Sequence, residues 1–326
     1  MIRLTLPKEF ESRTGDLLSK YTSLKVGGRA DRVVPVYSQQ QLCRLRRFCL
    51  KHSVRFFTLG GGTNVFFSDQ GFAGVIALIR FARLEPCGKY EVLAEAGVRL
   101  SRITRFCLRH NLTGFEFATG IPGTLGGAVC GNAGAYGRTV GDLVLSARIL
   151  DERGRVRDVE RGYFEFAYRH SRLKNSPVHL LQARLRLERG EPGAIRARVS
   201  EISVLRRSKL PDWHTATAGS YFKNLKDEKG GGVAAAVYLD AVDSKNASVN
   251  DAAVHPKHAN IFYNKGRARA ADFLALEDLL RTRVENEFGI RLEREVIYVE
   301  LNKEDHNDEG SDLYAAHTRG STRLRG

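Results

Sequence analysis

The chain of 326 residues lacks several features that would place it at once in a well-defined class. Its five cysteines are odd in number and include no C-x-x-C pair, which argues against a zinc site and a disulfide framework. No apolar run reaches the roughly 18 residues of a membrane span, and the start, MIRLTLPKEFESRTGD, has no signal-peptide core. We therefore expect a cytoplasmic protein that is not attached to a membrane.

The short motifs that commonly identify nucleotide-binding and nucleic-acid-binding proteins are also missing. No G-x-G-x-x-G lies between a strand and a helix, and there is no Gly-Lys-Ser/Thr phosphate loop. Helix-turn-helix, zinc-finger and RNA-recognition motifs are absent. The formal charge of +15 still suits a nucleic-acid binder, a membrane-surface protein or an enzyme with polyanionic ligands. A nucleic-acid binder therefore stays open as one alternative.

Hydrophobic residues make up 42% of the sequence, enough for more than one domain of mixed α+β structure. Their spacing predicts a helix over 37–52, with Ser38 as its cap and Gln41 completing a capping box. A second helix is expected to begin at the cap Ser101, and a long one to end at Gly289. The helices are predicted over 37–52, 101–111, 194–207 and 271–289.

Strand-like segments fill the regions between these helices. The last three before residue 190 alternate polar and apolar residues, and we interpret them as a meander. The predicted strands are 54–60, 64–69, 74–79, 90–98, 143–151, 154–160, 179–188 and 295–301.

The pattern divides the chain into four parts. Residues 1–83 and 84–190 each combine strands, one helix and a glycine-rich loop, so each is expected to be an α+β unit. A break at Glu191-Pro192-Gly193 starts a third unit, over 191–301. The polar, unpatterned tail 302–326 is expected to be disordered.

Each of the first two units contains one glycine-rich loop. TLGGGTNVFF places three glycines between two strands, where successive backbone N–H groups can form a nest for phosphate oxygens. ATGIPGTLGGAVCGNAGAYG spaces its glycines with small residues, so that a helix can begin against a ligand. Two such loops in neighbouring units suit a long ligand with a pyrophosphate in its middle.

Seven short motifs then follow one another along the chain: YTSLKVGGRAD, LGGGTNVFFSD, GFEFATGIPGTLGGAVCGNAGAYG, FAYRHS, AGSYFKN, KHANIFYN and FGIRLEREV. Their order, from about Tyr21 to about Val299, resembles the UDP-N-acetylenolpyruvoylglucosamine reductase (MurB) family. The resemblance implies a two-subdomain FAD-binding fold of the vanillyl-alcohol oxidase/PCMH type and a C-terminal α+β substrate domain. No extra segment separates YRHS from LLQARLRL, which is typical of the shorter type without a capping loop.

The activity that the resemblance implies is NADPH-dependent reduction of UDP-N-acetylglucosamine enolpyruvate to UDP-N-acetylmuramate, in peptidoglycan precursor synthesis. Non-covalent FAD would carry the hydride from NADPH to the vinyl carbon, leaving an enolate-like neighbour. That enolate needs cations or donors at its carboxylate and a proton delivered to carbon. The implied partners are this substrate and NADPH, and we expect a monomer that binds neither nucleic acid nor membrane.

Three residues are implied to carry the chemistry. Arg169 of FAYRHS would grip the carboxylate, and a protonated or proton-sharing Glu295 of EREV would lie on the same group. Ser220 of AGSYFKN would donate the proton. Each has an ordinary alternative, since Arg169 could be a solvated cation, Glu295 a surface strand residue beside Arg294, and Ser220 a turn residue.

The resemblance also implies contacts to the ligands. Tyr168, Asn224 and Lys209 would bind substrate, with Lys209 placed to meet the UDP phosphates. No metal site is expected, because His255 and His258 have no acidic or cysteine neighbours and better fit a turn into a strand. The implied FAD contacts are Gly60, Gly61, Gly62, Thr63, Asn64, Gly120, Ile121, Pro122, Gly123, Gly126, Gly127, Ala128, Asn132, Ala133 and Gly134.

The chain departs from the family pattern in one region. Leu225 stands where the family usually has proline, and residues 226–254 are unlike the usual segment, so no local structure is predicted there. The nearer alternative function is an oxidase or dehydrogenase of small alcohols with the same fold. Such enzymes often bind flavin covalently, and Cys130 would be the candidate here. Release of flavin on denaturation separates the two.

Overall fold

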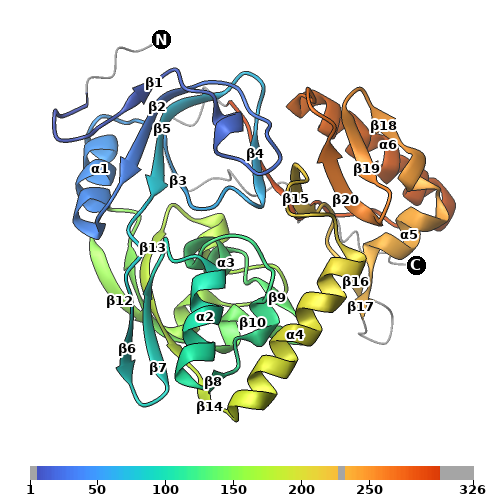
Figure 1. The fold of residues 1–326 in the computed structure, drawn as a ribbon. Helices are drawn as coiled ribbons and strands as arrows, with labels where there is room; N and C mark the ends of the chain where they lie inside the picture. The colour runs from blue at the N-terminus through green and yellow to red at the C-terminus, as the bar shows by residue number, and fades with distance from the viewer. Residues whose placement is uncertain (1–5, 227–231, 302–326) are drawn as a thin grey trace, which may run out of the picture.

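The first unit is a four-stranded sheet in the order β1-β2-β5-β3 with helix α1 against it (Figure 1). The computed structural model describes residues 6–226 and 232–301, and its α+β architecture agrees with the prediction. β2 and β3 both pair in parallel with β5. The bounds are β1 (Arg13–Thr14), β2 (Ala30–Val36), α1 (Gln39–Lys51), β3 (Phe56–Leu59) and β5 (Phe72–Ile79).

Helix α1 begins where the sequence predicts, with one difference in its cap. Ser38 Oγ accepts the Gln41 N–H at 3.1 Å, as expected for the N-cap. The Gln41 side chain accepts from the Tyr37 N–H at 2.7 Å and not from Ser38. The reciprocal half of the predicted capping box was therefore wrong by one residue, because the Gln41 side chain bonds to the residue before the N-cap.

The second unit is a five-stranded antiparallel sheet in the order β12-β11-β13-β7-β6. The predicted meander was wrong in its order, since β13 pairs with β11 and not with β12. The chain between β12 and β13 holds two 3₁₀ helices instead of a tight turn, which lets it cross β11. The bounds are β6 (Leu84–Gly88), β7 (Glu91–Glu95), α2 (Leu100–His110), β11 (Val144–Leu150), β12 (Val156–Glu160) and β13 (His179–Arg186).

The N-cap of helix α2 lies two positions earlier than predicted. Arg99 is its N-cap, and Ser101 lies inside the first turn. Leu100 is buried and donates its N–H to Gly123 O at 3.1 Å, so its packing fixes the start of the helix. Ile103 and Cys107 are buried, as the periodicity predicts.

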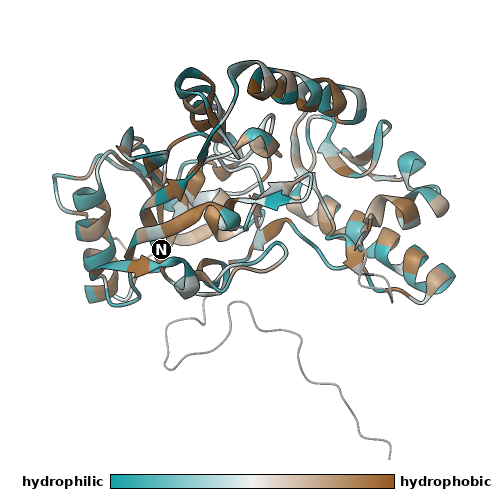
Figure 2. Cartoon of the chain, turned by 90° about the horizontal axis from the view of Figure 1, so that it is seen from below, coloured by the Kyte–Doolittle hydropathy of each residue, from teal (hydrophilic) through white to brown (hydrophobic). Residues whose placement is uncertain are grey.

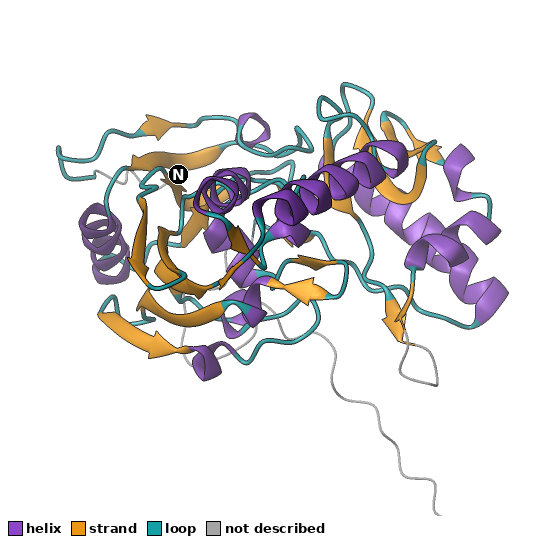
Figure 3. Ribbon diagram, turned by 60° about the horizontal axis from the view of Figure 1, so that its bottom comes forward, coloured by secondary structure: helices purple, strands orange, loops and turns teal. Residues whose placement is uncertain are grey.

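Helix α4 (Pro192–Lys209) leads from the second unit to the third (Figure 3). It begins within the segment interpreted as a break, with Glu191 as N-cap and Pro192 in the first turn. The third unit contains a sheet in the order β15-β20-β19-β18 and two helices. The bounds are β15 (Thr217–Ser220), α5 (Ala235–Ala241), β18 (Ser248–Val249), β19 (Ala252–His255), β20 (His258–Asn264) and α6 (Ala270–Phe288).

Helix α6 confirms the strongest helix prediction. Its inward residues are fully buried, and it ends at Gly289 in the left-handed conformation, with φ 66°. In the segment that departs from the family, Leu225 pairs with Val233 in a two-stranded ribbon, β16 (Leu225–Lys226) with β17 (Gly232–Val233). The intervening 227–231 and the predicted disordered tail 302–326 lie outside the described residues.

The chain finally returns to the first unit. β21 (Ile297–Val299) pairs in parallel with β4 (Val65–Phe67), which directly follows the first glycine loop. The Ile297 N–H donates to Asn64 O at 3.0 Å, and the Ser68 N–H donates to Val299 O at 2.9 Å. The predicted strand over 295–301 is thus shorter than expected, and it ties the third unit to the first.

Three clusters of buried apolar residues hold these units together. The largest joins α1 to the second sheet, so the first two units share a core. The core of the third unit also includes Leu24, Val26 and Phe66 of the first. Figure 2 shows the hydrophobic residues gathered on the inner strands, whereas the helices carry both hydrophobic and hydrophilic residues. None of the described helices is long and apolar enough to cross a membrane.

The remaining elements are β8 (Leu112–Thr113), β9 (Gly134–Ala135), β10 (Arg138–Thr139), β14 (Glu188–Arg189), α3 (Leu125–Cys130), and the 3₁₀ helices η1 (Leu18–Lys20), η2 (Glu116–Ala118), η3 (Val140–Asp142), η4 (Arg161–Phe164), η5 (Arg172–Asn175) and η6 (Ser244–Asn246).

Candidate active site

A cavity of about 1520 Å³ lies where the three units meet. It exceeds the roughly 300–1,000 Å³ of pockets for drug-sized ligands, so it suits a larger ligand or two ligands together. Both predicted glycine loops line it. Arg169, Ser220 and Glu295, which come from distant parts of the chain, line it as well.

The two glycine loops touch each other at the cavity wall. A Cβ on Gly60 would lie 2.3 Å from Thr124 Oγ1, and one on Gly61 would lie 3.0 Å from Gly123 Cα. Gly62 has φ +63°, and its Cβ would lie 1.9 Å from Tyr21 O. Glycine is therefore required for close packing and for backbone conformation, and it leaves bare backbone facing the cavity.

Several polar atoms at the wall are buried without a hydrogen-bond partner among the described residues. They include Thr124 Oγ1, His179 Nε2 and Arg206 Nε, all from residues that line the cavity. Burial and then Arg46 lower the pKa of His179 to about 3, so its ring is neutral. Buried polar groups are normally paired, and these atoms are thus available to the polar groups of a ligand.

Arg169 and Glu295 form an ion pair at one side of the cavity. Arg169 Nε lies 2.9 Å from Glu295 Oε1, with the side chains only 25% and 14% exposed. A second guanidinium nitrogen, Nη1, donates to Gly134 O at 3.0 Å. Arg169 has φ 52°, a left-handed conformation that costs roughly 1–2 kcal/mol for a residue with a side chain. The turn that holds Arg169 in this conformation directs its guanidinium group toward Glu295.

The burial of Glu295 opposes its charged form. Burial raises the pKa of this carboxyl, although Arg169, Lys174 and Lys223 act in the opposite direction. Its neighbour Arg294, which also lines the cavity, donates to Glu277 at 2.9 Å. Glu295 is only 14% exposed and lines the cavity, so it is not the surface residue of the alternative interpretation.

Ser220 ends β15 at the cavity wall, directly after Gly219 with φ 82°. The register of β15 against β20 shifts between Thr217 and Ser220, and the serine side chain is exposed. The next residue, Tyr221, accepts the Glu295 N–H through its carbonyl at 2.8 Å. Adjacent backbone segments therefore carry the serine and the glutamate.

Comparison with known proteins agrees with this geometry. Residues 30–160 match a family profile described as "FAD binding domain", and residues 211–299 match "UDP-N-acetylenolpyruvoylglucosamine reductase, C-terminal domain". A protein named UDP-N-acetylenolpyruvoylglucosamine reductase from Syntrophus aciditrophicus (strain SB) is 40% identical over 284 residues, 86% of this chain and 89% of that protein. The chain belongs to this reductase family, MurB.

Other members support the assignment. The reductase of that name from Caldanaerobacter subterraneus subsp. tengcongensis is 35% identical over 290 residues, 89% of this chain and 94% of its own. The crystal structure of MurB from Thermus caldophilus superposes with a TM-score of 0.73 at 26% identity, over 89% of this chain and 99% of that one. The predicted family and fold class are confirmed.

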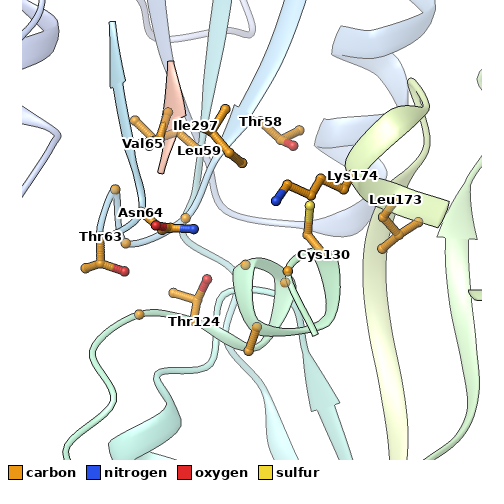
Figure 4. Close-up of a pocket in the computed structure, with 18 of the residues that line it drawn as sticks. Thr58, Leu59, Thr63, Asn64, Val65, Thr124, Cys130, Leu173, Lys174 and Ile297 are labelled. Carbon is orange, nitrogen blue, oxygen red and sulfur yellow. The ribbon is translucent and has the colours of Figure 1, made fainter. Parts of the chain in front are cut away.

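The cavity fits FAD, the cofactor of the MurB family. The glycine backbones and the unpaired polar atoms offer donors for its phosphates and ring system. Figure 4 shows Asn64 and Thr124 on the two loops, with Lys174 and Cys130 across the pocket. Of the predicted cofactor residues, all except Gly120 and Asn132 line the cavity.

These two exceptions support the site from behind. Asn132 donates its side-chain amide to Ala167 O at 2.8 Å and accepts the Gly141 N–H at 3.0 Å, which braces the turn that carries Arg169. Gly120, with φ +73°, lies so close to Arg206 that a Cβ would be 2.9 Å from its Nε.

The three predicted substrate residues lie outside the cavity wall. Tyr168 Oη accepts the Asn224 N–H at 3.1 Å, so these two residues lie together. Lys209 is exposed at the end of α4. Their roles in binding substrate stay predictions.

Sequence reasoning missed several polar residues that line the cavity, among them Lys174, His179 and Arg206. With 52 lysines and arginines in the chain, residue type alone does not single out the cations that face a ligand. In VLRRSK, for example, the packing of α4 on η2 decides that Arg206 is the arginine that faces the cavity.

The two histidines set aside as a metal pair form a hairpin, as predicted. His255 and His258 face each other across β19 and β20. Their Nδ1 atoms accept the N–H groups of Lys257 and Asn260, both at 3.1 Å.

Proposed function

We propose that the chain reduces UDP-N-acetylglucosamine enolpyruvate to UDP-N-acetylmuramate, with Arg169, Glu295 and Ser220 as its catalytic residues. The observation that carries the proposal is the partly buried Arg169–Glu295 pair beside Ser220 in the FAD cavity. When bound, FAD accepts two electrons from NADPH and delivers them to the substrate vinyl group. The side chains must hold the substrate and supply the proton.

Arg169 and Glu295 would act on the carboxylate of the enolpyruvyl group. A guanidinium offers a planar pair of donors to a carboxylate, and charge-assisted bonds of this kind are strong. Two carboxylates repel each other, but the raised pKa of Glu295 favours a neutral acid that can donate its O–H. Both groups then stabilise the charge that reaches this carboxylate when the double bond is reduced.

Ser220 would complete the reaction at the carbon next to that carboxylate. A C–H bond forms there as the Ser220 O–H bond breaks, and solvent restores the serine proton. A hydroxyl is a weak acid, so this transfer requires the strongly basic carbon that Arg169 and Glu295 make accessible. The exposed position of Ser220 at the cavity wall is compatible with the return of a proton from water.

The purified protein is expected to be yellow and to release intact FAD on denaturation. The Cys130 thiol, whose pKa burial raises to about 11, is a poor nucleophile for a covalent link. Absorbance of the supernatant after acid precipitation measures release. NADPH oxidation that requires the enolpyruvyl substrate tests the whole proposal; flavin that stays on the polypeptide would favour the oxidase alternative instead.

Replacing Gly62 with alanine is expected to abolish FAD retention. The new Cβ would lie 1.9 Å from Tyr21 O at a φ of +63°, so the loop must move. FAD content per polypeptide and a dissociation constant from flavin fluorescence measure the effect. Gly162→Ala is the matched control, because a Cβ there meets no atom within 4 Å. Equal FAD content in both variants would contradict the assigned role of the loop.

Activity is expected to fall as pH rises through the raised pKa of Glu295. The neutral acid is the form that binds the substrate carboxylate, and burial keeps it neutral above the usual range of a glutamate. The folded state then holds a proton that the unfolded state has lost, so stability also decreases across that range as pH rises. A kcat/KM profile should show this basic limb in wild type and lack it in Glu295→Gln.

The remaining assignments rest on sequence and family membership. We keep the division into FAD-binding units 1–83 and 84–190 and a substrate unit 191–301, and propose that Tyr168, Asn224 and Lys209 contact the substrate. We further propose a cytoplasmic monomer that binds neither nucleic acid nor membrane. Anionic UDP-sugar, FAD and NADPH offer an explanation for part of the +15 charge.

A further inference from the structure

Lys174 is a cation of the cavity wall that the mechanism above leaves unused. It belongs to η5, five residues after Arg169, and its side chain turns back into the pocket (Figure 4). No carboxylate forms an ion pair with it among the residues that the structure describes. Burial, and next the charge of Lys223, lowers the pKa of Lys174, although Cys130, Glu295 and Glu293 act in the opposite direction.

Within the residues that the structure describes, the ammonium group of Lys174 makes one hydrogen bond, to the backbone of Arg169. Lys174 Nζ donates to Arg169 O at 3.3 Å. That carbonyl belongs to the left-handed residue of a tight turn in which Ala167 and His170 exchange both N–H···O bonds at 3.1 Å. Lys174 therefore fastens the turn at the residue whose side chain must reach Glu295.

The groups around Lys174 determine what its positive charge can interact with. The Cys130 thiol nearby has a pKa raised to about 11 and stays neutral, and Lys223 is paired with Glu293. Burial raises the pKa of the Glu295 carboxyl. An anionic substrate carboxylate that binds between Arg169 and Glu295 would be attracted by the positive charge of Lys174.

We propose that Lys174 is a positioning residue, which holds Arg169 in its left-handed turn and adds positive potential where the substrate carboxylate binds. This inference deepens the proposed function and rests on it for the identity of the ligand. The positioning of Arg169 is independent of that identity, because it depends only on a contact within the chain.

The experiment compares Lys174→Met, which keeps the apolar stem, with Lys174→Arg, which keeps the charge. Lys245→Met, at an exposed lysine paired with Asp240 in the third unit, is the control. Hydrogen exchange of residues 167–172 measures the turn in the FAD-bound protein. Calorimetric titration with the enolpyruvyl substrate measures its dissociation constant, and the rate of flavin bleaching by NADPH reports the cofactor site.

In Lys174→Met we expect amide exchange in the turn to accelerate and substrate binding to weaken, each by roughly ten- to a hundredfold, the worth of a hydrogen bond to a charged group. FAD content and bleaching by NADPH should stay within about threefold, and Lys174→Arg should recover part of the loss. The inference would be overturned if Lys174→Met showed the same hydrogen exchange and substrate binding as Lys245→Met. It would also be overturned if Lys174→Met lost FAD as strongly as it lost substrate affinity. If wild type failed to bind or reduce the substrate, the proposed function would fall, while hydrogen exchange would still decide the positioning of Arg169.

Discussion

Ser220→Ala is expected to slow reoxidation of the flavin by the enolpyruvyl substrate roughly 10²–10⁴-fold, the usual effect of losing a positioned acid. Alanine keeps the backbone of β15, but it removes the hydroxyl that we propose protonates the substrate carbon. FAD content and flavin reduction by NADPH should stay near those of wild type, because Ser220 is proposed to act only in the second half-reaction. Stopped-flow absorbance at the flavin band measures both halves separately.

Two further variants make this test specific. Ser220→Cys retains an ionisable hydrogen and should recover part of the rate, whereas Ser248→Ala, at an exposed serine of the same sheet, should behave like wild type. In heavy water the wild-type product should carry deuterium on the carbon next to the carboxylate. Normal reoxidation in a well-folded Ser220→Ala protein would exclude the serine as the proton donor and return it to a structural role.

Removing either member of the ion pair is expected to lower the rate of substrate reduction by roughly 10²–10³-fold, the cost of losing one group that stabilises developing charge. Arg169→Ala also leaves the buried Glu295 without its 2.9 Å partner, so the pKa of that carboxyl should rise further. Glu295→Gln should lose much less than Glu295→Ala, because a neutral amide can still donate to the substrate carboxylate. Rapid-mixing kinetics with prereduced enzyme give each rate.

The matched control for this pair is Arg148→Ala, which breaks a surface ion pair with Asp158. It should leave both half-reactions unchanged, since exposed pairs contribute little. A loss in Arg169→Ala that affected flavin reduction by NADPH as strongly as substrate reduction would point to damage of the cofactor site. A Glu295→Gln variant as impaired as Glu295→Ala would contradict the neutral-acid role.

Local patterns predicted the helices better than the pairing of strands. α6 could be predicted because its apolar stripe and the stop at Gly289 are encoded within a single segment. The order β12-β11-β13 could not, because a strand's polar alternation is the same whichever neighbour it pairs with. Strand β2, which contains Pro35, was not predicted at all, although it lies inside the first sheet.

The residues of the candidate site could likewise be predicted only where a short motif carries them. Arg169, Ser220 and Glu295 could be selected because ordered motifs of a known family carry them, and the fold then brings all three to one cavity. Lys174 could not, because its contact with Arg169 O requires η5 to turn the side chain back across the loop. Asn132 was expected to meet the cofactor, yet it binds the backbone of the Arg169 turn.

The parallel pairing of β21 with β4 has a consequence for the order of events during synthesis. β4 leaves the ribosome long before its partner residues Ile297 and Val299. Asn64, in the first glycine loop, receives its hydrogen bond from the Ile297 N–H, so this edge of the FAD cavity cannot close on an incomplete chain. Loading of the cofactor should therefore follow synthesis of residues 297–299, and a nascent chain stalled before Ile297 should expose an unpaired strand to chaperones.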